Sequence, residues 1–388
     1  MGIYGSPRET TPYLDSVISD WIRFENHFPN LSRTSGAMAS ILTGKHGTTT
    51  HKLHSSHVLK GRDSFEHLPG VLRGLGYSTL QLGWRHHVDA RHWNMGNAFD
   101  VVNISSTKEG MFDRIASLGG GQHALTMHFV GHVVYRIQER LQHAFGGMLM
   151  VQSHKKDPDK NTITSQERIE RFFEFLSAHP GPVFAQLHLD RTKDDEQMRQ
   201  FDQFLESILT RLRAENRFES SVIAILTDHA EHYAVDIRVP LLMRFPTAVE
   251  HSPVSYNSQN LDLAPTLIDY LGLDVPPWME GRSLLHPVER LDPIFGIAAQ
   301  WNSKGIPIHG IPSSASGGPT EIYMTVCQRT YRLNLVDGVL TSPIVSGHTA
   351  PCDVGDLPRP EEASRMLNRH LKDRSYAYGV LRAGRDEH

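Results

Sequence analysis

Apolar residues in this chain alternate between two spacings, one typical of helices and one of buried strands. Between residues 65 and 76 they recur at helical spacing, and residues 77–83 then form a short strand-like run. The same succession returns as a helix at 165–179, a strand at 182–189, a helix at 194–215 and a strand at 221–226. Helices that alternate with strands predict an α/β fold, with a mostly parallel central sheet sandwiched by helices.

The two ends of the chain carry different patterns. Thr11 and Pro12 can begin a helix, which we expect to run to about Phe24. Beyond about Pro287, short alternating runs predict antiparallel strands at 322–326, 330–335 and 338–344, with a hairpin turn at Asp337-Gly338 and a helix at 360–381. We therefore expect a large domain at 1–288 and a small α+β subdomain at 289–388.

Composition excludes several classes of protein. With 39% hydrophobic and 21% charged residues, the 388-residue chain resembles an ordinary globular protein. A formal net charge of -4 gives no bulk attraction to nucleic acid or anionic membranes. No apolar run has transmembrane length and the start does not resemble a signal peptide. We interpret Cys327 and Cys352 as free thiols of a cytoplasmic protein, because two cysteines do not form a disulfide framework.

The stretch from Thr34 to Lys45 contains the first candidate for chemistry. Its small residues suit a short helix packed closely on a sheet, and Gly44 should end that helix. Thr34 then lies at the helix N-terminus, where free N–H groups and the helix dipole favour an anion. A nucleophile that receives an anionic group suits this place. The alternative is that the hydroxyl simply caps an ordinary helix.

Leu42-Thr43-Gly44-Lys45 resembles the Leu-Thr-Gly-Arg of the sulfatase-like family in the alkaline-phosphatase superfamily. This alignment places Thr34 at the nucleophile and Lys45 at a substrate-binding basic position. Sulfatases carry Cys or Ser at the nucleophile position, oxidised to formylglycine, and Arg where this chain has Met38. Thr cannot yield that aldehyde, so the resemblance implies phosphate esters rather than sulfate esters.

A second motif follows the strand at 221–226, which ends in Thr227-Asp228-His229. An oxygen and a nitrogen ligand at the end of a buried strand suit a divalent cation. The alternative is that Asp228 caps the next turn and His229 is exposed. The stretch resembles the family's Thr/Ser-Asp-His/Asn-Gly metal motif, which implies that Asp228, His229 and Thr34 bind Ca²⁺, Zn²⁺ or Mn²⁺; the residues do not distinguish these ions.

The resemblance also assigns residues to the substrate. His188, at the end of the strand at 182–189, occupies the place of a catalytic His. His86 falls on a substrate-binding His, Lys193 replaces a second one, and His232 is nearest to a family Lys that this chain lacks. The resemblance covers about 2–285, apart from 101–160, which we interpret as an insertion with a helix at 128–145. The family's first metal-binding strand would precede Met1.

The sequence therefore predicts a metal-dependent hydrolase or transferase of phosphate or sulfate esters, with Thr34 as nucleophile. Expected substrates are small-molecule, glycan or lipid esters, and no nucleic acid or membrane span is expected. Without the first strand of the family, the alternative is a catalytically inactive homologue that acts as a binding or interaction protein.

Overall fold

The structure is a computed structural model that describes residues 1–19, 21–55, 57–84, 87–95, 97–103, 137, 163–190, 192–231, 234–247, 253–286, 291–299 and 318–376. The chain forms two compact units, one of Met1–His54 with Thr192–His388 and the other of Ser55–Arg191. The predicted insertion at 101–160 lies outside the described residues except for positions 101–103 and 137. The expected domain boundary at residue 288 stays a prediction.

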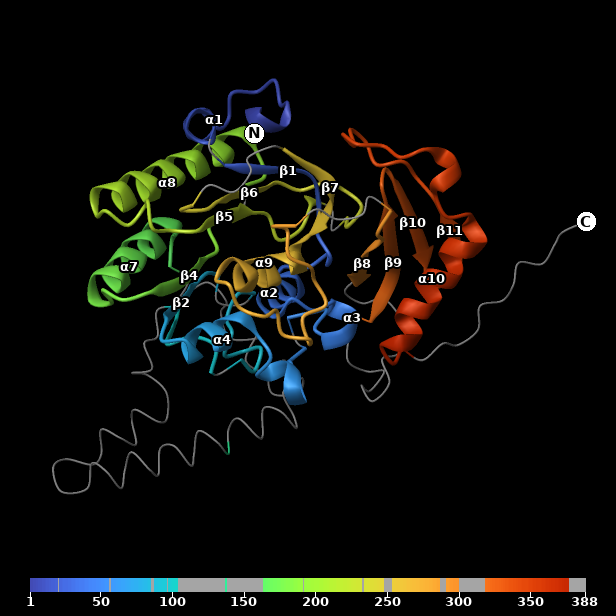
Figure 1. Ribbon diagram of the computed structural model, residues 1–388, viewed down its shortest axis with the longest axis horizontal. Coiled ribbons are helices and arrows are strands. Elements are labelled where there is room, and N and C mark those ends of the chain that lie inside the picture. Colours follow the sequence, from blue (N-terminus) through green and yellow to red (C-terminus); the bar gives the residue numbers. More distant parts are fainter. Residues whose placement is uncertain are drawn as a thin grey trace, which may run out of the picture. The chain divides into compact units, whose positions relative to one another are not determined.

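A four-stranded sheet forms the centre of the first unit (Figure 1). Its order is β5 (Ile223–Leu226), β6 (Leu241–Arg244), β1 (Ile22–Phe28) and β7 (Val254–Gln259). β1 is antiparallel to β6 and parallel to β7, and β5 is antiparallel to β6. The sheet therefore places the segments that follow β1 and β5, which contain Thr34 and Asp228, in one unit.

The helix expected to reach Phe24 is shorter than predicted, and that prediction was wrong. α1 (Pro12–Val17) ends five residues before β1 begins at Ile22. Ile22, Phe24 and Phe28 are buried and occupy even-numbered positions, which is the period of a strand rather than of a helix. Asp202 of α8 (Asp195–Ala214) stabilises the short helix, because its carboxylate accepts from the N–H groups of Tyr13 and Leu14.

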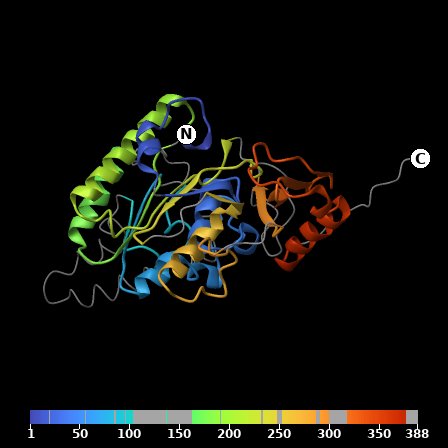
Figure 2. The same cartoon turned by 45° about the horizontal axis from the view of Figure 1, so that its top comes forward.

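Several short helices precede or connect the strands of this unit. They are η1 (Gly2–Tyr4), α2 (Thr34–Thr43), α3 (Gly47–Thr50), η6 (Asn260–Asp262) and α9 (Leu263–Tyr270). α2 and α9 lie side by side and contact each other (Figure 2). Gly44 ends α2 in the left-handed region, with φ of 64°, so the predicted end of that helix is confirmed.

The second unit contains a three-stranded parallel sheet in the order β3 (Val101–Val102), β2 (Ser78–Leu82) and β4 (Val183–Leu187). Its helices are η2 (Gly61–Ser64), α4 (Leu68–Gly74) and α7 (Ser165–Ala178). Thr164 and Glu167 form a capping box that fixes the start of α7. The predicted helix–strand pairs at 65–83 and 165–189 are therefore confirmed, as is the α/β class.

The C-terminal part of the first unit is a four-stranded antiparallel sheet in the order β11-β10-β9-β8. Its elements are β8 (Ile294–Ala299), β9 (Pro319–Val326), β10 (Arg329–Asn334), β11 (Leu340–Thr341), η7 (Val354–Asp356) and α10 (Pro360–Asp373). α10 packs on this sheet (Figure 1) through buried Ala363, Leu367 and Leu371. The expected small α+β subdomain is confirmed, although β8 was not predicted.

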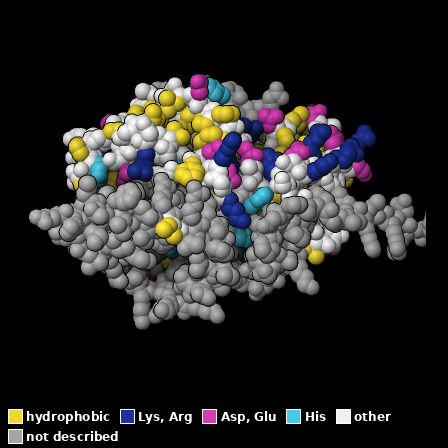
Figure 3. All heavy atoms as spheres, turned by 90° about the horizontal axis from the view of Figure 1, so that it is seen from below, with side chains coloured by type: hydrophobic (Ala, Val, Ile, Leu, Met, Phe, Trp, Pro, Cys, Tyr) yellow, Lys and Arg dark blue, Asp and Glu magenta, His cyan; other side chains and the backbone are white. Residues whose placement is uncertain are grey.

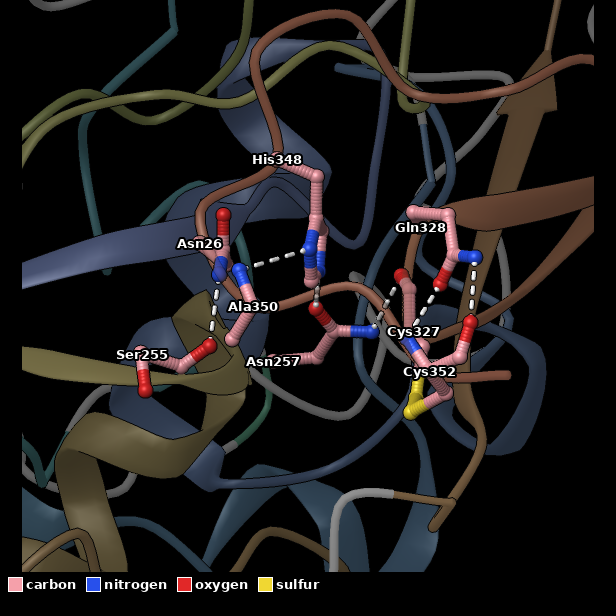
Figure 4. Close-up of a disulfide and its surroundings, with 8 residues drawn as sticks. All are labelled: Asn26, Ser255, Asn257, Cys327, Gln328, His348, Ala350 and Cys352. Atoms are coloured by element: carbon pink, nitrogen blue, oxygen red, sulfur yellow. Dashed lines mark hydrogen bonds between the residues drawn. A yellow bond between two sulfur atoms is a disulfide. The ribbon is translucent and has the colours of Figure 1, made fainter.

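Cys327 and Cys352 form a disulfide, so the prediction of free thiols was wrong. The two residues are 25 positions apart, and the turn after β9 brings Cys327 against the loop that carries Cys352 (Figure 4). Two cysteines suffice for one bridge even though they form no framework. The thiol argument for a reducing compartment, and with it for a cytoplasmic protein, no longer holds.

The surface carries charges of both signs. Among the side chains coloured in Figure 3, basic, acidic and apolar ones are interspersed, and the chain has 39 basic and 43 acidic residues. Within the described residues, no helix combines the length and the apolar character needed to cross a bilayer.

Candidate active site

Thr34 and His229 meet in the first unit, although 195 positions separate them in the sequence. Thr34 is the first residue of α2, and His229 follows β5. The Thr34 Oγ1 atom lies 3.0 Å from His229 Nε2. The N-cap of α2 is Arg33, with no side-chain capping bond. The Thr34 hydroxyl therefore pairs with an imidazole instead of capping the helix.

The backbone fixes which nitrogen of His229 carries the proton. Nδ1 lies 2.9 Å from the carbonyl oxygen of Ala230. Because a carbonyl only accepts hydrogen bonds, Nδ1 carries the hydrogen and Nε2 of the neutral ring is the acceptor. The Thr34 hydroxyl consequently donates to Nε2. A nucleophile, a base within hydrogen-bond reach and a group that orients the base are the three parts of an activated-hydroxyl site.

Asp228 brings a carboxylate to the same place. Its Oδ2 lies 3.6 Å from His229 Nε2, and the two side chains are 15% and 14% exposed. His229 is thus not the exposed side chain that the capping alternative required. At this distance the carboxylate would stabilise the imidazolium that forms when His229 takes a proton.

A buried relay holds the backbone before His229. Asn260 Nδ2 donates to the carbonyl oxygens of Asp228 at 2.7 Å and Thr227 at 3.3 Å. Its Oδ1 accepts from His27 Nε2 at 2.9 Å, and Nδ1 of His27 accepts from Ser258 Oγ, also at 2.9 Å. Burial lowers the pKa of His27 from 6.5 to about 4, so its ring is neutral. In this series of hydrogen bonds, Nδ1 of His27 is therefore an acceptor and Nε2 is a donor.

Of the other predicted site residues, the structure describes Lys45, Lys193 and His188. Lys45 is buried beyond the C-terminal end of α2, with Nζ 5.4 Å from the Trp278 ring centroid. A helix of ten residues is about 15 Å long, so the structure does not bring Lys45 to Thr34. Lys193 is exposed just before α8, and its N–H donates to Gln197. His86 and His232 lie outside the described residues.

His188 belongs to the second unit, at the carboxyl end of β4. Its N–H donates to the carbonyl of Leu82, and its own carbonyl accepts from Arg168 Nη1 at 2.9 Å. Arg168 is fully buried and also contacts Asp190. The strand end predicted for His188 is confirmed; its catalytic role stays a prediction.

The described residues around Thr34 provide too few ligands for a divalent cation. Asp228 and His229 are two strong ligands, and Thr34 adds only a neutral hydroxyl. Within the described ranges, no group of three or more His, Cys, Asp or Glu side chains is placed to hold a metal ion. Protein metal sites ordinarily use three or four such ligands, so these residues do not complete one.

Sequence reasoning missed His27 and Asn260. His27 comes shortly after the end expected for the first helix, about Phe24, and no element was predicted for it, whereas it lies near the end of β1. An Asn-His pair within an otherwise alternating apolar strand was the available signal, because a polar side chain buried in a strand needs a partner. No signal in the sequence indicated that this partner is Asn260, 233 positions away.

Comparisons with known proteins identify the family of this chain. The model of the Sulfatase family matches residues 1–273. An extracellular sulfatase homologue of Drosophila melanogaster is 29% identical over 107 residues, which cover 24% of this chain and 10% of that protein. An N-acetylglucosamine-6-O-sulfatase of Bacteroides thetaiotaomicron is 20% identical over 377 residues, which cover 73% of this chain and 67% of that protein.

A solved structure extends the likeness along the whole fold. A protein of the alkaline phosphatase superfamily from Vibrio parahaemolyticus aligns with a TM-score of 0.58 and 14% identity, over 98% of this chain and 85% of its own. The present chain spans only about a tenth of the Drosophila sulfatase that it matches.

Proposed function

Because the chain belongs to the Sulfatase family, we propose that it hydrolyses phosphate or sulfate esters with Thr34 as the nucleophile. The distance of 3.0 Å between Thr34 Oγ1 and His229 Nε2 is the observation that carries this proposal. A hydroxyl is a weak nucleophile at neutral pH, and a base that accepts its proton removes that weakness. Sugar esters are the substrate class to try first, since one relative is an N-acetylglucosamine-6-O-sulfatase.

In the first step, Oγ1 of Thr34 attacks the phosphorus while His229 Nε2 takes its proton. The bond from phosphorus to the alcohol oxygen breaks, and that oxygen takes a proton from a general acid. Asp228 stabilises the imidazolium of His229, since its Oδ2 lies 3.6 Å from Nε2. The N–H groups in the first turn of α2 favour the non-bridging oxygens.

In the second step, water attacks the phosphothreonine and gives a proton to the group that protonated the alcohol. The bond between phosphorus and Thr34 Oγ1 breaks, and Oγ1 recovers its proton from His229. The sum is one ester plus one water, and both residues return to their starting protonation states.

Phosphorus is the favoured centre because of the side chain at position 34. Sulfatases use a formylglycine hydrate to release sulfate, and a threonine side chain cannot form that aldehyde. A threonine phosphate ester, by contrast, can be hydrolysed directly. Sulfate esters are the second candidate, since the curated relatives named above are sulfatases.

Aryl phosphodiesters, aryl phosphate monoesters and aryl sulfates, assayed in parallel, test this function. We expect faster turnover of the phosphate esters and a loss of at least about 10³-fold in kcat for Thr34→Ala. Thr43→Val is the matched control, since among the described residues the buried Thr43 hydroxyl donates to the carbonyl of Ala39 within α2 and accepts from the N–H of Lys45. Aryl sulfate turnover that survives Thr34→Ala would contradict the proposal, and no turnover of any ester would favour the non-catalytic alternative.

Metal analysis of the dialysed protein tests whether Asp228, His229 and Thr34 suffice to bind a divalent cation. We expect low and equal occupancy in the wild type and in Asp228→Ala. Metal that is bound by the wild type and lost in Asp228→Ala would show that Asp228 is a ligand of a bound cation.

A further inference from the structure

Lys52 is a buried lysine that touches the first turn of α2. Its side chain is 0% exposed. Nζ donates to Ser35 Oγ at 2.7 Å and to the carbonyl oxygen of His54 at 2.8 Å. Ser35 follows Thr34 directly and is itself buried. A long basic side chain with no access to water therefore ends one residue from the proposed nucleophile.

The backbone around Lys52 is held in the same place. α3 ends at Thr50, and His51 turns the chain with φ of 54°, so that Lys52 returns to α2. A Cβ atom at Gly36 would lie only 2.6 Å from the Lys52 carbonyl oxygen. Only glycine permits this approach, since real Cβ atoms do not come so close. The segment at 50–54 thus contacts two successive residues after Thr34.

Burying a lysine side chain costs free energy, because its ammonium group loses its hydration. Burial penalises the ammonium and lowers the pKa of Lys52 well below its usual value. Both described acceptors of Nζ are neutral oxygens, and a methionine would fill a similar volume without a polar group. What an amine adds over an apolar side chain is donors with fixed direction. One of these donors fixes the hydroxyl of Ser35, and through it the first turn of the helix.

We propose that Lys52 is a positioning residue for Thr34, and that it acts through Ser35. The proposal rests on the proposed function of Thr34. The Thr34 hydroxyl must keep its 3.0 Å contact with His229 while it attacks. Thr34 is the first residue of α2, so its neighbour within the helix is Ser35, and the position of Ser35 helps to fix the backbone of Thr34. A misplacement of about 1 Å in a reacting group can cost on the order of 10²-fold in rate.

Lys52→Met and Ser35→Ala test the proposal, with Thr43→Val as the matched control. Thr43→Val also removes a buried hydroxyl from α2, but at its other end. We expect Lys52→Met to lower kcat on an aryl phosphate by roughly 10–10²-fold with KM changed less than about threefold. Ser35→Ala should lower kcat in the same way, and the double variant should lose little more than Lys52→Met, because one contact is removed in each case.

A second measurement is independent of turnover. The ¹⁵N chemical shift of His229 Nε2 reports its hydrogen bond with Thr34 in the protein without substrate. We expect Lys52→Met and Ser35→Ala to move this signal toward its value in Thr34→Ala, and Thr43→Val to leave it unchanged. If Lys52→Met does not fold, Ser35→Ala alone decides.

The outcomes separate the two proposals. An inactive wild type whose His229 signal still responds to Ser35→Ala would sink the proposed function and keep the positioning role. An active wild type whose kcat and His229 signal resist both variants would overturn the role of Lys52. Equal losses of kcat in Thr43→Val and Lys52→Met, at equal losses of melting temperature, would reduce Lys52 to a residue that only stabilises the fold.

Discussion

Two histidine–asparagine pairs have different roles, although their asparagines, Asn257 in β7 and Asn260 in η6, are close in the sequence. His27 Nε2 donates to Asn260 Oδ1, and Asn260 donates to the carbonyl of Asp228. His348 Nε2 donates to Asn257 Oδ1, and Asn257 donates to the carbonyl of Cys327 (Figure 4). The direction of every bond is the same in both pairs. The first pair supports the candidate site, whereas the second supports the disulfide.

The comparison shows how the ring of His229 differs from that of His348. Nδ1 of His348 accepts from the N–H of Ala350, so Nε2 carries the hydrogen and acts as a donor. Nδ1 of His229 instead donates to the carbonyl of Ala230, so Nε2 is left as an acceptor for Thr34. One backbone contact, to a carbonyl or to an N–H, therefore separates the candidate base from a histidine that ties down a loop.

The largest expected effect is the difference in kcat/KM between substitutions of His229 and of His348. We expect His229→Gln to lower kcat/KM on the preferred ester by about 10²–10⁴-fold, the usual contribution of a general base. His348→Gln should leave kcat/KM within about threefold and reduce the melting temperature. Steady-state kinetics and thermal unfolding of both variants check this. A loss of activity in His348→Gln as large as in His229→Gln would break the distinction.

The disulfide offers the next test, since it anchors the His348–Asn257 pair. The Cys327→Ser/Cys352→Ser variant opens a loop of 25 residues, and the chain-entropy estimate for such a loop is about 3.5 kcal/mol. We expect a loss of this order in the free energy of unfolding, measured with urea, and little change in kcat/KM. Unchanged stability would mean that the hydrogen bonds of Gln328 and Asn257 hold the loop alone.

The His27–Asn260 pair should respond to acid. Because the folded pKa of His27 is about 4 and the ordinary value is 6.5, the unfolded chain binds the proton more readily between these values. The contribution of His27 is therefore complete above pH 6.5 and is lost as the pH falls toward 4. Between pH 7 and pH 4.5 this amounts to roughly 2.5 kcal/mol.

Urea unfolding of the wild type and His27→Gln at several pH values measures the His27 contribution. We expect a shallower loss of stability with acid in the variant, because one titrating ring has been removed. Parallel pH profiles for the two proteins would show that His27 is not the group that is titrated. His46, also buried with its pKa lowered to about 4, should contribute equally to both profiles.

The sequence was a good guide to parts of this fold and a poor one to others. Thr34 at the start of α2, Gly44 at its end and Asp228-His229 after β5 could all be predicted, because turn residues and strand ends are local signals. β1 was missed, since a seven-residue strand with four polar residues resembles a helix end or a loop. The disulfide was missed because cysteine count alone does not report proximity.

Partners far apart in sequence could not be predicted at all. A buried His or Lys has a low cost only when a partner is supplied, and the partner of His27 comes from 233 positions away. Even Lys52 and Ser35, 17 positions apart, meet only because the chain turns back after α3. Such contacts depend on the packing of the whole sheet, which a local pattern does not contain.

The smallest effect should separate the two asparagines themselves. Asn260→Ala and Asn257→Ala each remove a buried amide. Asn260→Ala removes the donor to the carbonyls of Asp228 and Thr227, and Asn257→Ala removes the donor to the carbonyl of Cys327. A buried carbonyl left without its donor typically costs about 1–3 kcal/mol. We expect similar losses of stability by urea unfolding. Asn260→Ala should also lower kcat about tenfold, since the carbonyl that it releases belongs to Asp228, next to His229. Asn257→Ala should leave kcat unchanged, because its carbonyl belongs to the disulfide. Equal kcat values in the two variants would mean that the strand end holds His229 without help from Asn260.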